Sequence, residues 1–307
     1  MPDLLKTLKR FLSEPLLPDF LVQLTEDRIS GLRVSGGEGK AKKYFIQLLK
    51  PGLIEPSAEK NNFRQPEEVI KSIQLGMRQL GAESGEVSLL LPEACFRVFI
   101  LPAESLPATH REKEALIRWR IKKLYPVLPD DFRFDYQVFS ADSTLRLLVA
   151  GARAAIIEEY EKLLSQAKWR VRVVGVPTLQ LASLLKEPDI FLINIERDYL
   201  TILAAAKKIP LLYRAKSFWR EKERATVFSQ QCLAEIENTL HFLEDKEKVQ
   251  FKEVYLRWGV TSEASDLLIS SLEDSGLQVR RFGALRLSNL EAGDREILAP
   301  LWGQIGS

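Results

Sequence analysis

One order of predicted elements occurs twice in this chain, and this repeat limits the possible folds more than any other feature. Each copy has three strand-like runs, then an amphipathic helix, then a further strand. In the first copy these segments are residues 19–24, 29–34, 44–49, 66–80 and 87–91. In the second copy they are residues 190–195, 199–205, 209–213, 222–244 and 251–256. The repeat predicts an α/β chain of two βββαβ halves, 19–187 and 188–307, with a cleft between them.

The first two strands of each copy are joined by a short polar tip, at residues 25–28 and 196–198. Because the two copies share one order of elements, we expect both tips to face the cleft. A helix at 262–275 and a short strand at 277–282 follow the second copy. Only a few residues precede the helix at 222–244, which predicts a reduced lid subdomain in the second half.

A small α+β unit interrupts the first half at about residues 92–150. Its predicted elements are a strand at 96–102, a helix ending near 125, and strands at 134–139 and 145–151. Thr109 and Glu112 stand in the spacing of a capping box ahead of this helix. Ile117, Ile121 and Leu124 then recur on one helical face. Strand, helix and two strands together form a compact insertion.

Composition excludes several classes of protein. A chain of 307 residues with 46% hydrophobic residues can bury more than one core. Its net charge of +2 provides no electrostatic footprint for nucleic acid. Cys95 and Cys232 lie far apart in the sequence, so buried free thiols in a reducing compartment are the expected reading.

Residues 1–18 form an amphipathic N-terminal segment. Its apolar stripe consists of Leu4, Leu5, Leu8, Phe11 and Leu12. The stripe either docks on the chain's own domain or lies weakly on a membrane surface. The chain shows no run of 18 apolar residues and no signal-peptide layout, so a cytoplasmic location is expected.

The duplicated halves resemble the actin-like ATPase superfamily, whose halves are RNase H-like, and the insertion resembles that of the PilM family within it. PilM proteins are the cytoplasmic actin-like component of type IV pilus assembly. The segments that carry the resemblance are residues 89–92, 100–102, 117–126, 134–138, 147–152 and 173–177. The related GspL proteins continue into a transmembrane helix, whereas no such segment precedes Ser307, which favours PilM.

This resemblance implies a scaffold that binds the short cytoplasmic tail of PilN, a single-pass membrane protein. It also implies contacts with the pilus assembly ATPase and the PilC platform protein, and indirect association with the cytoplasmic face of the inner membrane. We expect the tail to occupy a groove beside the insertion. The groove residues expected from the predicted strand and helix are Arg97, Phe99, Leu101 and Arg118.

The phosphate-binding residues of the superfamily are absent. In the resembled family each first turn reads Asp-x-Gly, whereas the matching positions here are Gln23 with Thr25 and Asn194 with Glu196. The adenosine-side Gly-Gly pair is reduced to Gly259. A phosphate clamp needs glycine for backbone approach and an Asp for Mg²⁺, and the acidic tips are expected to repel phosphate. The sequence therefore predicts a degenerate nucleotide site with no catalytic residue, metal or cofactor.

Two alternatives stay open, a nucleotide-dependent actin-like ATPase switch and a GspL-like component of type II secretion.

His110 and His241 lie on charged helices and are expected to be solvated. Six cations between Arg111 and Lys123 surround the insertion helix and face anionic lipid, an acidic tail or only water. Trp119 stands among them and is expected to be a core anchor more than a contact residue.

Overall fold

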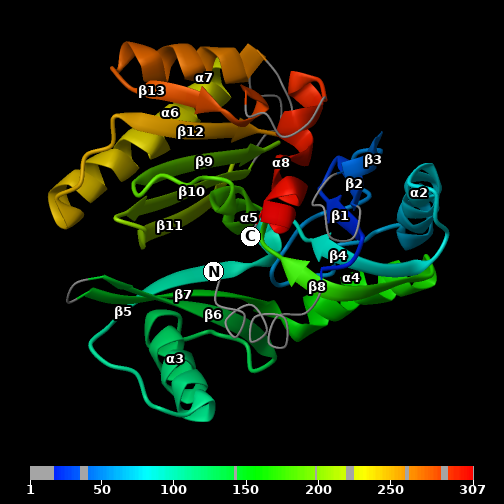
Figure 1. Ribbon diagram of the computed structural model, residues 1–307, viewed down its shortest axis with the longest axis horizontal. Coiled ribbons are helices and arrows are strands. Elements are labelled where there is room, and N and C mark those ends of the chain that lie inside the picture. The colour runs from blue at the N-terminus through cyan, green and yellow to red at the C-terminus, as the bar shows by residue number, and fades with distance from the viewer. Residues whose placement is uncertain are drawn as a thin grey trace, which may run out of the picture.

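The computed structural model of this chain describes residues 17–34, 41–141, 144–197, 199–218, 225–259, 263–284 and 290–306. These residues form two five-stranded sheets, a three-stranded sheet and the helices that pack on them (Figure 1). The stripe predicted for the N-terminal segment lies outside the described residues. No helix in the described ranges is both long and apolar enough to cross a membrane.

The first half contains a sheet with the order β3-β2-β1-β4-β8. Its strands are β1 (Phe20–Leu24), β2 (Arg28–Val34), β3 (Ala41–Leu48), β4 (Gly85–Leu90) and β8 (Trp169–Gly175). The first three strands form an antiparallel meander, and β4 and β8 are added in parallel. The helices of this half are α2 (Pro66–Gln79), α4 (Ala154–Gln166) and α5 (Pro177–Ser183). Pro66 opens α2, whose Val69, Ile73 and Met77 are buried on one face as predicted.

The second half repeats this arrangement in the sheet order β11-β10-β9-β12-β13. Its strands are β9 (Ile190–Glu196), β10 (Tyr199–Ala206), β11 (Ile209–Ser217), β12 (Glu253–Trp258) and β13 (Gln278–Arg281). Its helices are α6 (Ala225–Phe242), α7 (Glu263–Asp274) and α8 (Ala292–Gly306). The predicted βββαβ repeat is therefore confirmed. Only residues 218–224 separate β11 from α6.

The last helix of each half lies between the two sheets (Figure 1). Helix α8 packs on β1 and β2 of the first half, while α5 packs on β9 and β10 of the second. The two helices also contact each other, and an added Cβ at Gly303 would stand 1.9 Å from the carbonyl oxygen of Gln180. Helix α8 was not predicted, because Pro300 inside it is a helix-breaking signal.

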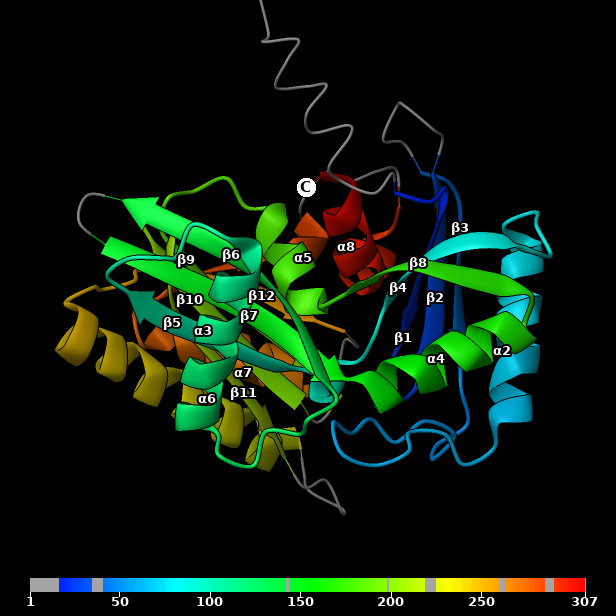
Figure 2. The ribbon, with the colours of Figure 1, turned by 90° about the horizontal axis from the view of Figure 1, so that it is seen from below.

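The insertion is a three-stranded antiparallel sheet covered by one helix. Its elements are β5 (Arg97–Ala103), α3 (His110–Leu124), β6 (Phe132–Ala141) and β7 (Thr144–Arg153), in the sheet order β5-β7-β6. The Oγ1 atom of Thr109 accepts a hydrogen bond from the backbone N–H of Glu112 at 3.3 Å, which confirms the predicted cap. Helix α3 covers the outer face of this sheet, and β11 of the second half contacts the insertion from the other side (Figure 1, Figure 2).

Candidate functional site between the two halves

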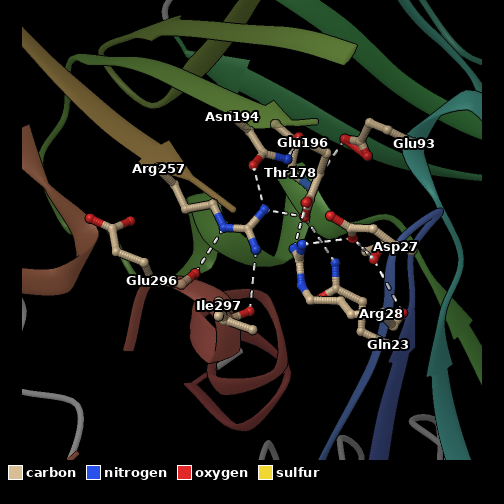
Figure 3. Close-up of polar contacts among 11 residues, drawn as sticks. Gln23, Asp27, Arg28, Glu93, Thr178, Asn194, Glu196, Arg257, Glu296 and Ile297 are labelled. Atoms are coloured by element: carbon tan, nitrogen blue, oxygen red, sulfur yellow. Dashed lines mark hydrogen bonds and ion pairs between the residues drawn. The ribbon is translucent and has the colours of Figure 1, made fainter. Parts of the chain in front are cut away.

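The two predicted tips meet and are joined by ion pairs. Arg28, the first residue of β2, donates from Nη2 to the Oε2 atom of Glu196 at 2.5 Å. In the opposite direction, Arg197 Nε lies 3.1 Å from the Oε1 atom of Glu26. The turn after β1 and the turn after β9 therefore bind each other directly. Figure 3 shows Arg28 and Gln23 pointing toward Glu196 across the junction.

Glu196 also pairs with a second buried cation, Arg257 near the end of β12. The guanidinium of Arg257 donates to Asn194 Oδ1 at 3.0 Å and to the backbone carbonyl groups of Glu296 and Ile297 at 2.8 and 3.2 Å. Arg257 is 0% exposed and Arg28 is 1% exposed. One carboxylate thus lies between two buried guanidinium groups, and Arg257 connects β9, β12 and α8 (Figure 3).

These contacts correct the expectation that the acidic tips repel an incoming phosphate. Burial alone raises the pKa of Glu196, but the positive charges of Arg257 and Arg28 outweigh that effect and lower the pKa below its ordinary value. Asp27 is paired with Arg28 at 2.9 Å, and Glu26 is paired with Arg197. The acidic groups are neutralised by their neighbours. Sequence reasoning did not assign Arg257 a role, although an arginine between Leu256 and Trp258 in an apolar strand was the available signal.

Four of the five positions that the sequence comparison matched to the nucleotide loops lie in this network. Gln23 donates from Nε2 to Glu196 Oε1 at 3.3 Å, and Asn194 donates from Nδ2 to Thr178 Oγ1 at 2.9 Å. At Gly259 an added Cβ would stand 2.2 Å from Glu196 Oε2, so glycine is needed for the ion pair itself.

The fifth position, Thr25, contributes only within its own turn. Its hydroxyl donates to Asp27 Oδ1 at 2.9 Å. Across the network, side chains fill the space between the turns, and their charges are already balanced. Asp27, Glu26 and Glu196 each pair with an arginine, so none of these carboxylates is left as an uncompensated ligand for Mg²⁺. The described residues also contain no group of three or more side chains suited to hold a metal ion.

A second buried acid, Glu93, lies beside this network and was not identified from the sequence. Its Oε1 atom accepts hydrogen bonds from the Tyr213 hydroxyl at 2.7 Å and from the backbone N–H of Thr178 at 3.1 Å. Its Oε2 atom has no partner among the described residues. Burial raises the pKa of Glu93 to about 7, and the hydrogen bonds from Thr178 and Tyr213 only partly offset this. The carboxyl group therefore connects the first half to β11 of the second.

The residues expected to bind a partner are divided between three environments. Leu101 is 2% exposed inside the insertion core, so its place on a groove surface was wrong. Phe99 is partly buried against the same core. Arg97 and Glu59 of the first half both line a recess of about 20 Å³. The Nη2 atom of Arg97 lies 3.5 Å from the Oε1 atom of Glu59. Arg118 instead lines a separate hollow of about 560 Å³.

Other predictions about single residues had mixed outcomes. Cys95 and Cys232 are buried and are not disulfide-bonded, and His110 and His241 are exposed, as expected. The preference for Trp119 as a core residue was wrong, because its side chain is 57% exposed on α3.

Comparison with known proteins defines the class of this chain. No protein-family model and no curated protein sequence matches it. Its structure has the actin-like ATPase fold, as in a Bacteroides thetaiotaomicron protein of unknown function (TM-score 0.54, 12% identity, 91% of this chain and 94% of that one). EutJ, an ethanolamine utilization protein of Carboxydothermus hydrogenoformans, is also similar (TM-score 0.52, 10% identity, 95% and 91%). The predicted fold class is confirmed.

A stronger structural likeness is to a "PilM-PilN type IV pilus biogenesis complex". The TM-score is 0.74 at 16% identity, and the match covers 95% of this chain and 97% of that one. The resemblance to PilM that the sequence predicted is therefore confirmed in the fold.

Proposed function

We propose that this chain is a non-catalytic scaffold of a type IV pilus assembly complex and binds the cytoplasmic tail of a PilN-like membrane protein. The single observation that supports it most is the structural likeness to PilM over nearly the whole chain. In this proposal the tail holds the scaffold at the cytoplasmic face of the inner membrane. Contacts with a pilus assembly ATPase and a PilC-like platform protein belong to the same proposal.

The scaffold works without nucleotide in this proposal. Glu196 occupies the place between the first turns of the two halves, and Arg28 and Arg257 bind it there. A phosphate at this position would have to displace a charge-paired carboxylate from two buried cations. The displaced carboxylate of Glu196 would then lose its two cation partners, and leaving one charge of a buried pair uncompensated costs about 3–5 kcal/mol. This cost supports a fold that has kept its architecture without its phosphate chemistry.

We place the tail at the recess beside Arg97, where the insertion meets the body of the first half. The recess is lined by Glu59 from the body and by Tyr125 and Phe132 from the insertion. The Arg97–Glu59 pair is long and partly exposed, so a carboxylate or carbonyl group of the tail can replace Glu59 at little cost. Arg118 borders the other hollow and is left out of this contact.

The test is capture of the immobilised cytoplasmic tail of a PilN-like protein encoded beside this chain. The full-length chain is expected to be retained. Arg97→Glu should reduce retention at least about tenfold, because a charge reversal within a contact commonly costs more than 1.4 kcal/mol. Arg78→Glu, on the exposed surface of α2, is the matched control and should be retained like the unchanged chain.

Arg118→Glu is expected to leave capture intact, with an unchanged melting temperature for every variant. Loss of capture with Arg118→Glu but not with Arg97→Glu would show that the tail binds at the hollow lined by Arg118 and not at the recess beside Arg97. If the unchanged chain fails to bind the tail, the scaffold proposal is wrong.

A further inference from the structure

The back of α3 and the residues after it form an exposed apolar and basic surface that the proposed tail contact does not use. Trp119 on the back of α3 is 57% exposed, and Leu124 and Val127, at the end of the helix and just beyond it, are 66% and 73% exposed. They are three of the nine large hydrophobic side chains that are exposed in the described part of the chain. Leu124 shares its helical side with Ile117, as predicted, but it lies in the last turn and is not covered by the core. Helix α3 is also the outermost layer of the insertion, on the side away from the second half (Figure 1, Figure 2). We call residues 111–127 the α3 surface.

The charge of the α3 surface is strongly positive. Its cations are Arg111, Lys113, Arg118, Arg120, Lys122 and Lys123. The two acids of the helix are engaged locally, because Glu112 accepts a hydrogen bond from the Thr109 cap and Glu114 pairs with His110. Lys122 pairs with the exposed carboxylate of Asp130 at 3.3 Å, a solvent-exposed contact of little strength. These acids leave most of the cations uncompensated, which makes the surface complementary to a dense negative charge.

Trp119 lies at the centre of the face of α3 that points away from the core. Ile117 and Ile121 are buried beneath the helix, and in helical geometry Trp119 projects roughly opposite to both. Lys122 and Lys123 lie one turn further along, one on each side of the tryptophan. The Nζ atom of Lys123 is 4.8 Å from the centre of the Trp119 ring. An amphipathic aromatic ring is thus flanked by two flexible cations.

Two kinds of anionic partner fit this charge, and the shape of the surface favours one. An aromatic side chain that anchors a protein partner usually fills a pocket at the centre of the contact. The hollow beside α3 is lined by Arg111, Arg118 and Arg133 toward β6, and Trp119 does not line it. A protruding tryptophan flanked by lysines is typical of a membrane interface, where the ring enters the headgroup layer and the lysines reach phosphates.

We propose that the α3 surface docks on an anionic lipid bilayer, with Trp119 entering the headgroup region and Lys122 and Lys123 contacting lipid phosphates. This contact is independent of the proposed tail site beside Arg97. It uses the side of α3 that faces away from the core of the insertion, and it needs no partner protein. It adds a direct, reversible and salt-sensitive attachment to the membrane surface.

The test is co-sedimentation of the full-length chain with vesicles of phosphatidylglycerol and phosphatidylcholine, compared with vesicles of phosphatidylcholine alone. Binding is expected only to the anionic vesicles and should weaken with added salt. Trp119→Ala should reduce the partition about tenfold, because the buried ring contributes through its apolar area. The double variant Lys122→Gln/Lys123→Gln should reduce it about 25-fold, at about fivefold for each charge.

Matched controls lie on α2, where Leu75 and Lys71 also stand exposed four residues apart. Leu75→Ala and Lys71→Gln are expected to leave the partition unchanged. All variants carry the same N-terminal residues, so any difference belongs to the substituted surface. If the variants of α3 bind as well as the controls, or if the chain binds both vesicle types equally, the proposal is wrong. Binding of acidic peptides through Trp119 without vesicle binding would also overturn it.

Discussion

Arg257 is the side chain on which the junction between the two halves depends most. Its guanidinium is fully buried and binds a carboxylate, a side-chain amide and two backbone carbonyl groups. Burial of a charge is unfavourable unless paired charges and hydrogen bonds compensate for the lost water. Here Glu196 provides the charge, and β9 and α8 provide the acceptors. The planar fork of arginine binds all of these groups at once, which lysine cannot do.

Replacement of Arg257 by Met should therefore be strongly destabilising. The substitution leaves Glu196 with Arg28 as its remaining ion-pair partner and removes the donors to Glu296 and Ile297. We expect the free energy of unfolding to fall by about 3–5 kcal/mol. Urea denaturation measures this value.

The double variant Glu196→Gln/Arg257→Met tests the mechanism, because it removes the carboxylate that Arg257 compensates. It should be less destabilised than the sum of its single variants. Strict additivity, or a loss below about 1 kcal/mol for Arg257→Met, would contradict the role of the ion pair.

Glu93 should make stability depend on pH near neutrality. Its pKa is raised to about 7 in the folded chain, whereas in the unfolded chain it has the ordinary value of 4.5. Between these values the folded state keeps a proton that the unfolded state has lost, so stability falls as pH rises. Glu196 acts in a different window, because its lowered pKa contributes stability that is lost only as pH falls below its ordinary range.

Glu93→Gln should remove the neutral-range dependence, since the amide does not ionise. Urea midpoints at about pH 5 and about pH 8 should differ in the unchanged chain, with the higher value at the lower pH, and should converge in the variant. Glu59→Gln, an exposed carboxylate on the neighbouring loop, is the control and should keep the difference. An unchanged slope in Glu93→Gln would assign the effect to another group.

Among the elements, the helices α5 and α8 explain why the two halves are not independent. Each ends one half and packs on the sheet of the other, so the two cores share their boundary. Leu298, Leu301 and Trp302 of α8 are buried against Leu21 and other residues of the first sheet. A hydrophobic stripe in the sequence indicates that a helix is buried but not which sheet covers it.

The insertion shows the opposite balance between local and distant information. Its strands and its capped helix are encoded by alternation and by the Thr109–Glu112 spacing, and both signals act within a few residues. Trp119 was misassigned because an aromatic residue on a helix looks the same in sequence whether it faces a core or the solvent. Its exposure depends on which face of α3 meets β5, β6 and β7.

At the scale of the whole molecule, the ion pairs between the turn after β1 and the turn after β9 predict that nucleotide does not change the stability of the chain. A ligand at 100 times its dissociation constant would add about 2.7 kcal/mol to the stability of the folded state. That gain would raise the melting temperature by at least about 4 °C for a chain of this size. We expect no change in millimolar Mg-ATP. An actin-like ATPase with intact Asp-x-Gly turns, measured in the same buffer, is the positive control, and a comparable rise here would contradict the prediction.

The repeat of elements, the position of the insertion and the absence of Asp-x-Gly from both first turns were readable from residue order, because periodicity and turn chemistry are local properties. The ion-paired junction between the two halves could not be predicted from the sequence. Nothing near Glu196 in the chain indicates that Arg28 and Arg257 neutralise it, since these residues are 168 and 61 positions away. The same holds for Glu93, whose raised pKa depends on Tyr213 and on burial between two sheets. Electrostatic compensation depends on distance in space, and folding alone sets that distance.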